Sequence, residues 1–199
     1  MVAGCGNSLL SEDMVDDGFK SILATDFSRV VIDQQILSSA SEYPEISYHQ
    51  CNMTSSFLDS QAFEAIIDKG LYDAIGCAVN GERAQKLYIR EVLRLLSLEG
   101  GTFILISHQL PEKVLLLLEN HDVRDVDFTP WQVEVSCIPK PIAFESEELN
   151  LNDMSSMYFI YVCCLNEGLK QQQIYREEKM VRRRRQRMGR KTWKSAPAL

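Results

Sequence analysis

Two glycines close to the start of the chain, in Gly4-Cys5-Gly6, are followed 20 residues later by a carboxylate, Asp26. Glycine takes positive φ and lets a ligand approach the backbone closely. A carboxylate at this spacing suits hydrogen bonds from ribose hydroxyls. Asn52 and Met53, later in the chain, can meet the edge and the face of a base. Together, and in this order, these residues predict a nucleoside-binding site.

The glycine loop also restricts which nucleoside fits. A dinucleotide-binding loop has a third glycine, for close packing of helix on strand, and Leu9 stands at that position. No phosphate-binding lysine pattern is present either. The loop therefore favours S-adenosylmethionine, which has no phosphates.

Cysteines and histidines show no spacing typical of a metal site. The cysteines form no CxxC pair and no disulfide framework, and the histidines form no ligand pattern with them; they are Cys5, Cys51, Cys77, Cys137, Cys163, Cys164, His49, His108 and His121. We expect no metal, and reduced, mostly buried thiols in a cytoplasmic protein.

The elements that must position these residues alternate along the chain. Hydrophobic periodicity predicts helices over 7–18, 28–40, 81–101 and 111–121, and strands over 1–3, 19–26, 46–51, 63–68, 101–107, 131–138 and 156–165. This alternation predicts a Rossmann-like α/β fold, doubly wound around a mostly parallel sheet. No helix separates the last two strands, so we expect a C-terminal antiparallel hairpin. In such a sheet the ligand lies beyond the carboxyl ends of the strands.

Charge divides the chain into an acidic body, residues 1–166, and a basic tail, residues 167–199. Residues 170–199 carry 11 of the 21 Lys and Arg side chains but two of the 28 Asp and Glu. The tail is predicted to be disordered or helical, and to act as a solvated end, a nuclear localisation signal, or a contact for RNA or the ribosome. No apolar run approaches the length of about 20 residues that spans a membrane.

Four segments carry a resemblance to a known family: GCGNSLLSEDMVDDGF, ATDFSRVVIDQ, NMTSSF and IIDKGLYDAI. They resemble the class I, seven-stranded methyltransferases. Within these they are most similar to the methyltransferase-like enzymes that modify translation elongation factor 1-alpha. The resemblance covers about residues 2–166, which it implies to be a methyltransferase domain that uses S-adenosylmethionine.

The resemblance also implies roles for single residues. Asp26 would hold the ribose, Phe27 would lie beside the adenine, and the Met53 N–H would meet the ring. Asn52 stands where the family has Asp, and its carbonyl oxygen would accept from the adenine amino group. The other predicted cofactor-binding residues are those of the glycine loop and the end of the fourth strand, namely Gly4, Cys5, Gly6, Asn7, Ser8, Asp68 and Lys69.

Methyl transfer requires orientation more than acid–base chemistry, because the cofactor carries the reactive group. A lysine acceptor must still lose a proton, which costs roughly 4.6 kcal/mol at neutral pH. Asp68, Tyr72 and Asp73 are the candidates to accept the proton or orient the amine, with capping and packing as the alternative roles.

These observations predict an enzyme that methylates a lysine or the N-terminus of a protein, with elongation factor 1-alpha as the substrate that the resemblance implies. The acidic body favours a basic protein segment as partner. A small-molecule methyltransferase and a non-catalytic binding module of the same fold are the alternatives. Residues 1–3 are short for a central strand, so we expect the sequence to be part of a longer one, or a reduced form with an open site.

Overall fold

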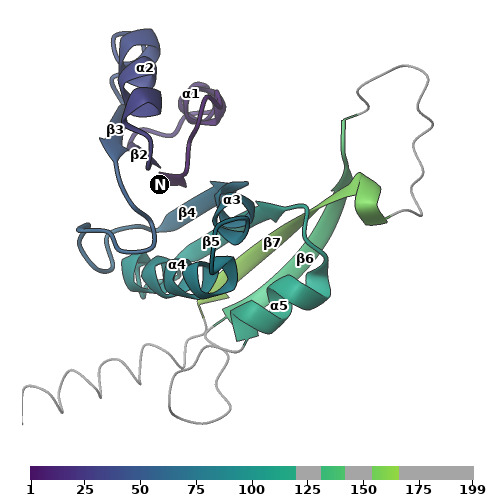
Figure 1. Cartoon of the computed structure of the whole chain (residues 1–199). Coiled ribbons are helices and arrows are strands. Elements are labelled where there is room, and N and C mark those ends of the chain that lie inside the picture. The colour runs from purple at the N-terminus through teal and green to yellow at the C-terminus, as the bar shows by residue number, and fades with distance from the viewer. Residues whose placement is uncertain (120–130, 142–153, 166–199) are drawn as a thin grey trace, which may run out of the picture. The chain divides into compact units, whose positions relative to one another are not determined.

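The structure is a computed structural model that describes residues 1–119, 131–141 and 154–165 (Figure 1). The elements within these residues follow one another in the order β1 (Val2–Ala3), α1 (Leu10–Asp16), β2 (Ile22–Asp26), α2 (Arg29–Ser39), β3 (Ile46–Gln50), β4 (Ala65–Lys69), α3 (Leu71–Gly76), α4 (Gly81–Leu95), β5 (Thr102–Ser107), α5 (Pro111–Glu119), β6 (Trp131–Pro139), a short 3₁₀ turn (Met154–Ser156) and β7 (Met157–Leu165).

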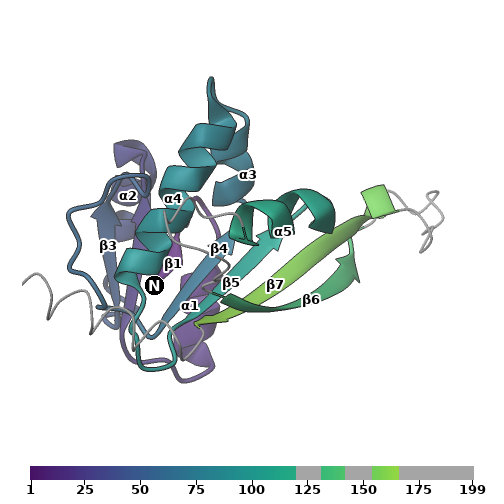
Figure 2. The ribbon, with the colours of Figure 1, turned by 90° about the horizontal axis from the view of Figure 1, so that it is seen from below.

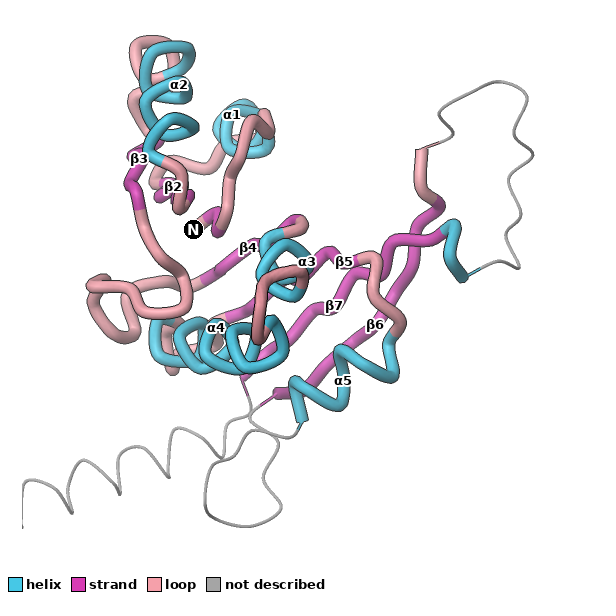
Figure 3. Tube along the Cα trace, in the orientation of Figure 1, coloured by secondary structure: helices cyan, strands magenta, loops and turns pink. Residues whose placement is uncertain are grey.

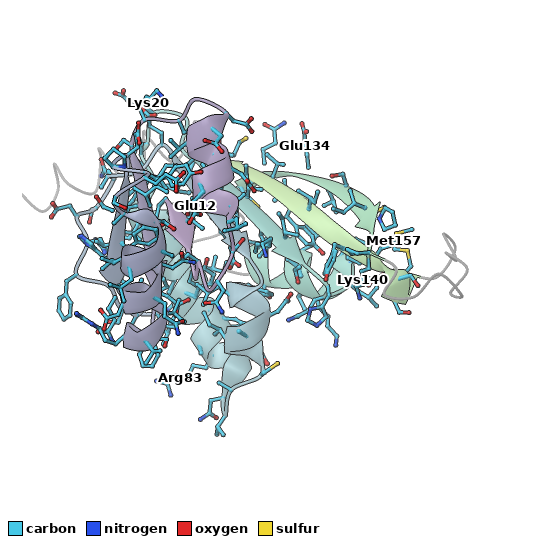
Figure 4. All side chains as sticks on the ribbon, turned by 90° about the horizontal axis from the view of Figure 1, so that it is seen from above. Glu12, Lys20, Arg83, Glu134, Lys140 and Met157 are labelled. Atoms are coloured by element: carbon cyan, nitrogen blue, oxygen red, sulfur yellow. The ribbon has the colours of Figure 1, made fainter. Side chains whose placement is uncertain are left out.

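The strands form one sheet in the order β3-β2-β1-β4-β5-β7-β6. Neighbours from β3 through to β5 pair in parallel, whereas β7 runs antiparallel to both β5 and β6. The order reverses at β1, so β1 and β4 mark the switch point where ligands of such sheets bind. The predicted α/β fold with a C-terminal antiparallel hairpin is confirmed. Lys140 and Met157 lie at the far end of that hairpin (Figure 4).

The first strand has two residues and is paired on both sides, with Val2 opposite Ala24 of β2 and Ile67 of β4. Met1 extends this pairing, because its amino group donates to the Ala65 carbonyl (2.7 Å) and its carbonyl accepts the Ile67 N–H (2.9 Å).

Side chains of β1 divide between two apolar clusters, because successive residues of a strand point to opposite faces. Val2 packs with Ile32 of α2 and with residues of β2 and β3. Ala3 belongs to the larger cluster, together with the buried residues of α4, α5 and the hairpin. Helices α3, α4 and α5 lie over one face of the sheet (Figure 2). The two clusters thus lie on opposite faces of the sheet, and the cluster with α2 involves β1, β2 and β3. In β4 and β5 one face is buried, and the residues of the other face are half-buried or exposed.

Local sequence explains most of the helices. Ser28 caps α2, since its Oγ accepts the Val31 N–H (3.4 Å). Along α4, Tyr88, Ile89 and Val92 recur at helical spacing on one side and are fully buried. Glu12 of α1 (Figure 4) accepts hydroxyl hydrogens from Ser39 (2.6 Å) and Tyr48 (3.3 Å), which ties α1 to α2 and β3.

Two features lie near the switch point. The first is the short helix α3, directly after β4, which was not predicted. The second is the long irregular segment of residues 51–64, which follows β3 where no helix or strand was predicted for residues 52–62 and is drawn as a loop in Figure 3. Both features border the ligand cavity described below.

Residues 167–199, the predicted basic tail, lie outside the described residues, and so do residues 142–153 between the last two strands. Among the helices that the structure does describe, none is both long and apolar enough to cross a membrane.

Candidate functional site

Four strand ends bring the predicted cofactor residues to one edge of the sheet. The glycine loop follows β1, Asp26 ends β2, Asn52 lies two residues after β3, and Lys69 ends β4. Because these strands are parallel neighbours, their carboxyl ends meet at the same edge.

Asp26 is joined directly to the glycine loop. Its Oδ2 accepts the Gly6 N–H (3.0 Å), and its Oδ1 accepts the Ser28 N–H at the start of α2 (2.8 Å). The loop is held from two further sides, since the Cys5 N–H donates to the Thr25 carbonyl (2.8 Å) and the Gln35 amide donates to the Gly6 carbonyl (2.9 Å). The 20-residue spacing read from the sequence therefore corresponds to a contact.

A cavity of about 240 Å³ opens beside this contact. Its lining combines the predicted residues with others from the following loop and helix, and consists of Gly4, Asp26, Phe27, Cys51, Asn52, Met53, Thr54, Leu71, Ala74 and Ile75. Sites for drug-sized ligands usually measure about 300–1,000 Å³. The cavity therefore has the size of a nucleoside rather than of a whole cofactor.

The glycines differ in their surroundings. Gly4 (φ +65°) packs against α3, and a Cβ built there would lie 2.7 Å from Leu71 Cβ. Gly6 (φ +52°) has no atom within 4 Å of the corresponding position, so its outer side is open space. Gly4 thus serves the contact between the loop and α3, and Gly6 leaves room for a ligand.

Of the predicted loop residues, Gly4 lines the cavity, whereas Cys5, Gly6, Asn7 and Ser8 do not. Cys5 is buried in the cluster around Val2, and burial raises the pKa of its thiol to about 11. Asn7 is exposed. Ser8 Oγ accepts the Leu10 N–H (3.3 Å) at the start of α1. The structure thus gives Cys5 and Ser8 contacts within the protein.

Asn52 and Met53 form another wall of the cavity. Met53 is buried, whereas Asn52 is exposed. Asn52 Oδ1 already accepts the Thr54 N–H (3.0 Å) and the Thr54 hydroxyl hydrogen (2.8 Å). This differs from the expectation that the same oxygen accepts from the adenine amino group.

Asp68 starts the short helix α3. Its two carboxylate oxygens accept the Leu71 N–H (2.7 Å) and the Tyr72 N–H (2.9 Å). The hydroxyl of the buried Tyr88 faces the same carboxyl without reaching hydrogen-bonding geometry. Asp68 has no exposed surface, and this burial raises its pKa to about 7. Lys69, the next residue, is exposed.

Asp73 holds the loop after β5. One carboxylate oxygen accepts hydrogens from the Ser107 hydroxyl (2.5 Å) and the Gln109 amide (3.3 Å). The other accepts the His108 N–H (3.1 Å) and lies 2.8 Å from His108 Nδ1. Sequence reasoning missed these three partners, which lie 34–36 residues away.

Helix α3 separates the nucleoside-sized cavity from a second one. Leu71, Ala74 and Ile75 face the first cavity, as expected for one side of a helix. Tyr72 borders a second cavity of about 460 Å³, whose other lining residues come from α4, α5 and the loop before α5, namely Glu82, Gln85, Lys86, Gln109, Lys113, Leu116 and Leu117. Burial raises the pKa of Tyr72 to about 12, so its hydroxyl stays protonated at neutral pH.

Solved structures with a similar arrangement include methyltransferases. A TehB-like SAM-dependent methyltransferase from Corynebacterium glutamicum superposes with a TM-score of 0.55 at 17% identity, over 83% of this chain and 79% of that one. The magnesium protoporphyrin IX methyltransferase of Synechocystis, solved with bound S-adenosylmethionine, gives a TM-score of 0.53 at 11% identity, over 81% of this chain and 67% of that one. This chain has the class I methyltransferase fold.

Sequence comparison relates this chain to a narrower group of methyltransferases. The eEF1A lysine and N-terminal methyltransferase of Danio rerio is 30% identical over 163 residues, which is 82% of this chain and 22% of that protein. The human protein of the same name is 35% identical over 109 residues, 54% of this chain and 16% of that one. The Drosophila melanogaster homolog is 32% identical over 132 residues, 65% of this chain and 18% of that one.

This chain therefore spans about a fifth of the length of these relatives. No protein-family model matches it. The predicted resemblance to the methyltransferases of elongation factor 1-alpha is confirmed as partial homology.

The residues around the first cavity fit the nucleoside end of S-adenosylmethionine. A carboxylate has about four acceptor positions, and Asp26 uses two of them for Gly6 and Ser28. The remaining two are suited to a pair of ribose hydroxyls. The Phe27 side chain is 69% exposed at the cavity, where it can cover a base.

Proposed function

We propose that this chain binds S-adenosylmethionine and transfers its methyl group to a protein, at a lysine or an N-terminal amine. The observation that carries the proposal is the contact between Asp26 and Gly6 at the wall of a nucleoside-sized cavity. The homology to eEF1A lysine and N-terminal methyltransferases supports the protein substrate.

The residues of the first cavity would act by binding and orienting. Asp26 would accept hydrogens from the ribose hydroxyls, and Phe27 with Met53 would enclose the base. The open side of Gly6 would let the rest of the cofactor lie along the loop. When bound, S-adenosylmethionine supplies an activated methyl group, so the protein contributes mainly position.

The acceptor amine must be neutral when it attacks. Of the three predicted acid–base residues, Asp68 has a pKa, about 7, that would let it exchange a proton at neutral pH, but it has no exposed surface. Tyr72 stays protonated, and Asp73 holds the loop after β5. We therefore propose positioning roles for Asp68 and Asp73, through the backbone groups that they bind.

The experiment is methylation of purified eEF1A with methyl-labelled S-adenosylmethionine, followed by mass spectrometry of its peptides. The proposal predicts label on a lysine or on the N-terminus, at a rate that rises with pH as the free amine becomes more abundant. At cofactor concentrations below saturation, Asp26→Ala should reduce the rate of labelling by about tenfold or more. Asp33→Ala, which removes an acidic residue of α2 paired with Arg29, should retain the rate. If purified eEF1A is replaced by cell lysate, label in small molecules alone would favour a small-molecule methyltransferase. Cofactor binding without any label would favour a non-catalytic module.

A further inference from the structure

The wall formed by Asn52 and Met53 determines how the site can recognise a purine, an inference that rests on the proposed cofactor site. Both residues line the nucleoside-sized cavity, next to Phe27. A base enclosed there would present its polar edge to one side-chain amide and to the backbone of the segment after β3.

The orientation of the Asn52 amide is fixed by Thr54. The Thr54 backbone N–H can only donate, so the Asn52 atom that it meets at 3.0 Å must be the oxygen. The Thr54 hydroxyl, 2.8 Å away, occupies the second lone pair of the same oxygen. The NH₂ group is therefore the part of this side chain that remains for a ligand.

Met53 adds a second donor at the same place. Its backbone N–H donates to no acceptor among the residues that the structure describes. The neighbouring positions 52 and 53, both in the lining of the cavity, thus carry two N–H groups that no described residue accepts. A carboxylate at position 52 would present an acceptor and a donor instead.

Adenine and hypoxanthine differ in the edge that such a wall would read. Adenine presents the N1 acceptor beside the 6-amino donor, whereas hypoxanthine presents the O6 acceptor beside the N1–H donor. The Asn52 NH₂ and the Met53 N–H would therefore meet one acceptor and one donor on either base, and would form one hydrogen bond with each. We infer that Asn52 makes the cofactor site tolerant at position 6 of the purine, so that the site binds the hypoxanthine form of the cofactor about as well as the adenine form.

The test compares S-adenosylhomocysteine with S-inosylhomocysteine by calorimetric titration. For the unchanged chain we expect the two dissociation constants to agree within about threefold, because each base forms one hydrogen bond with the two N–H groups and places one donor opposite the other. Asn52→Asp replaces the NH₂ donor by an acceptor. This variant should prefer the adenine ligand by about tenfold or more, since an added charge-assisted hydrogen bond exceeds that margin.

Asn80→Asp is the matched control, because it makes the same chemical change at another asparagine. Asn80 lies directly before α4 and lines neither cavity. Its ratio of dissociation constants should equal that of the unchanged chain. A tenfold preference for adenine in the unchanged chain, or an unchanged ratio in Asn52→Asp, would overturn the inference while leaving the cofactor site in place. Binding of neither ligand would overturn the proposed function and the inference together.

Discussion

The carboxylate of Asp26 accepts the backbone N–H of Gly6 at 3.0 Å, across 20 residues of chain. This bond connects the end of β2 to the loop after β1, at the point where the strand order reverses. Asp26 therefore serves the shape of the glycine loop and the wall of the cavity at the same time.

Asp26→Ala should weaken binding of S-adenosylmethionine by about tenfold or more, because ribose hydroxyls lose a charged acceptor worth about 1.5–3 kcal/mol. Calorimetric titration measures the affinity, and thermal unfolding shows whether the variant is folded. Asp33→Ala is the control for the loss of one acidic side chain. A folded Asp26→Ala variant with unchanged affinity would remove Asp26 from the site.

Alanine at Gly4 and at Gly6 should have different effects. Positive φ costs a non-glycine residue roughly 1–2 kcal/mol, and overpacking against Leu71 adds about 1–3 kcal/mol at Gly4. We expect Gly4→Ala to lower the free energy of unfolding by about 2–5 kcal/mol in chemical denaturation.

Gly6→Ala should be destabilised only by the positive φ, because the added Cβ meets no protein atom. It should remain folded and lose cofactor affinity, since the new methyl group occupies the open side of the loop. Equal destabilisation of the two variants would contradict the packing described for Gly4.

Arg94 of α4 should stabilise the segment that carries Asn52 and Met53. Its guanidinium donates to the Leu58 carbonyl (2.8 Å) and the Ser60 hydroxyl (2.9 Å), and pairs with Glu91 (2.7 Å). Arg94→Ala should lower the free energy of unfolding by about 1–3 kcal/mol, because the part-buried, charge-assisted hydrogen bonds to Leu58 and Glu91 are lost.

Arg94→Ala should also weaken cofactor binding, because the segment of residues 51–64 loses its attachment to α4. Arg90→Ala, an exposed arginine of the same helix, should change neither property. If Arg94→Ala binds the cofactor as tightly as the unchanged chain, the attachment does not shape the cavity.

The pKa of Asp68, about 7, predicts a pH dependence of stability. An unfolded Asp has a pKa near 3.9, so between about pH 4 and pH 7 the folded protein holds a proton that the unfolded chain releases. The stabilising contribution is complete below pH 4 and is lost as the pH rises to 7. Its size is at most about 4 kcal/mol at 1.36 kcal/mol per pH unit.

Asp68→Asn removes this titration, at the cost of a hydrogen bond to Leu71 or Tyr72. The difference in free energy of unfolding between the unchanged chain and the variant should therefore shrink from pH 4 to pH 7. Denaturation at four or five pH values measures it. A difference that stays constant over this range would show that Asp68 is ionised throughout.

Much of this arrangement could be predicted from local pattern. The apolar runs at residues 63–68 and 101–107 predicted strands, and β4 and β5 occupy these places, although each buries one face and leaves the other half-buried or exposed. The spacing of Gly6 and Asp26 predicted a shared site because parallel neighbours end at one edge of the sheet. The helix predicted over 28–40 begins where expected, since its first residue, Ser28, caps α2 through a residue three positions away.

The rest depends on contacts that no local pattern contains. Helix α3 has six residues and begins where the buried Asp68 binds two backbone N–H groups, so tertiary structure produces it. Asp73 binds a loop that is distant in sequence. The Asn52 amide is turned by Thr54, which composition and periodicity do not reveal.

The most direct test of the cofactor site is calorimetric titration of the chain with S-adenosylmethionine, repeated in the presence of excess NAD. The account predicts saturable binding with one cofactor per chain, and no displacement by NAD, because Leu9 stands in place of the third glycine of a dinucleotide loop. A folded chain that binds no S-adenosylmethionine at millimolar concentration, or that releases it to NAD, would contradict the account.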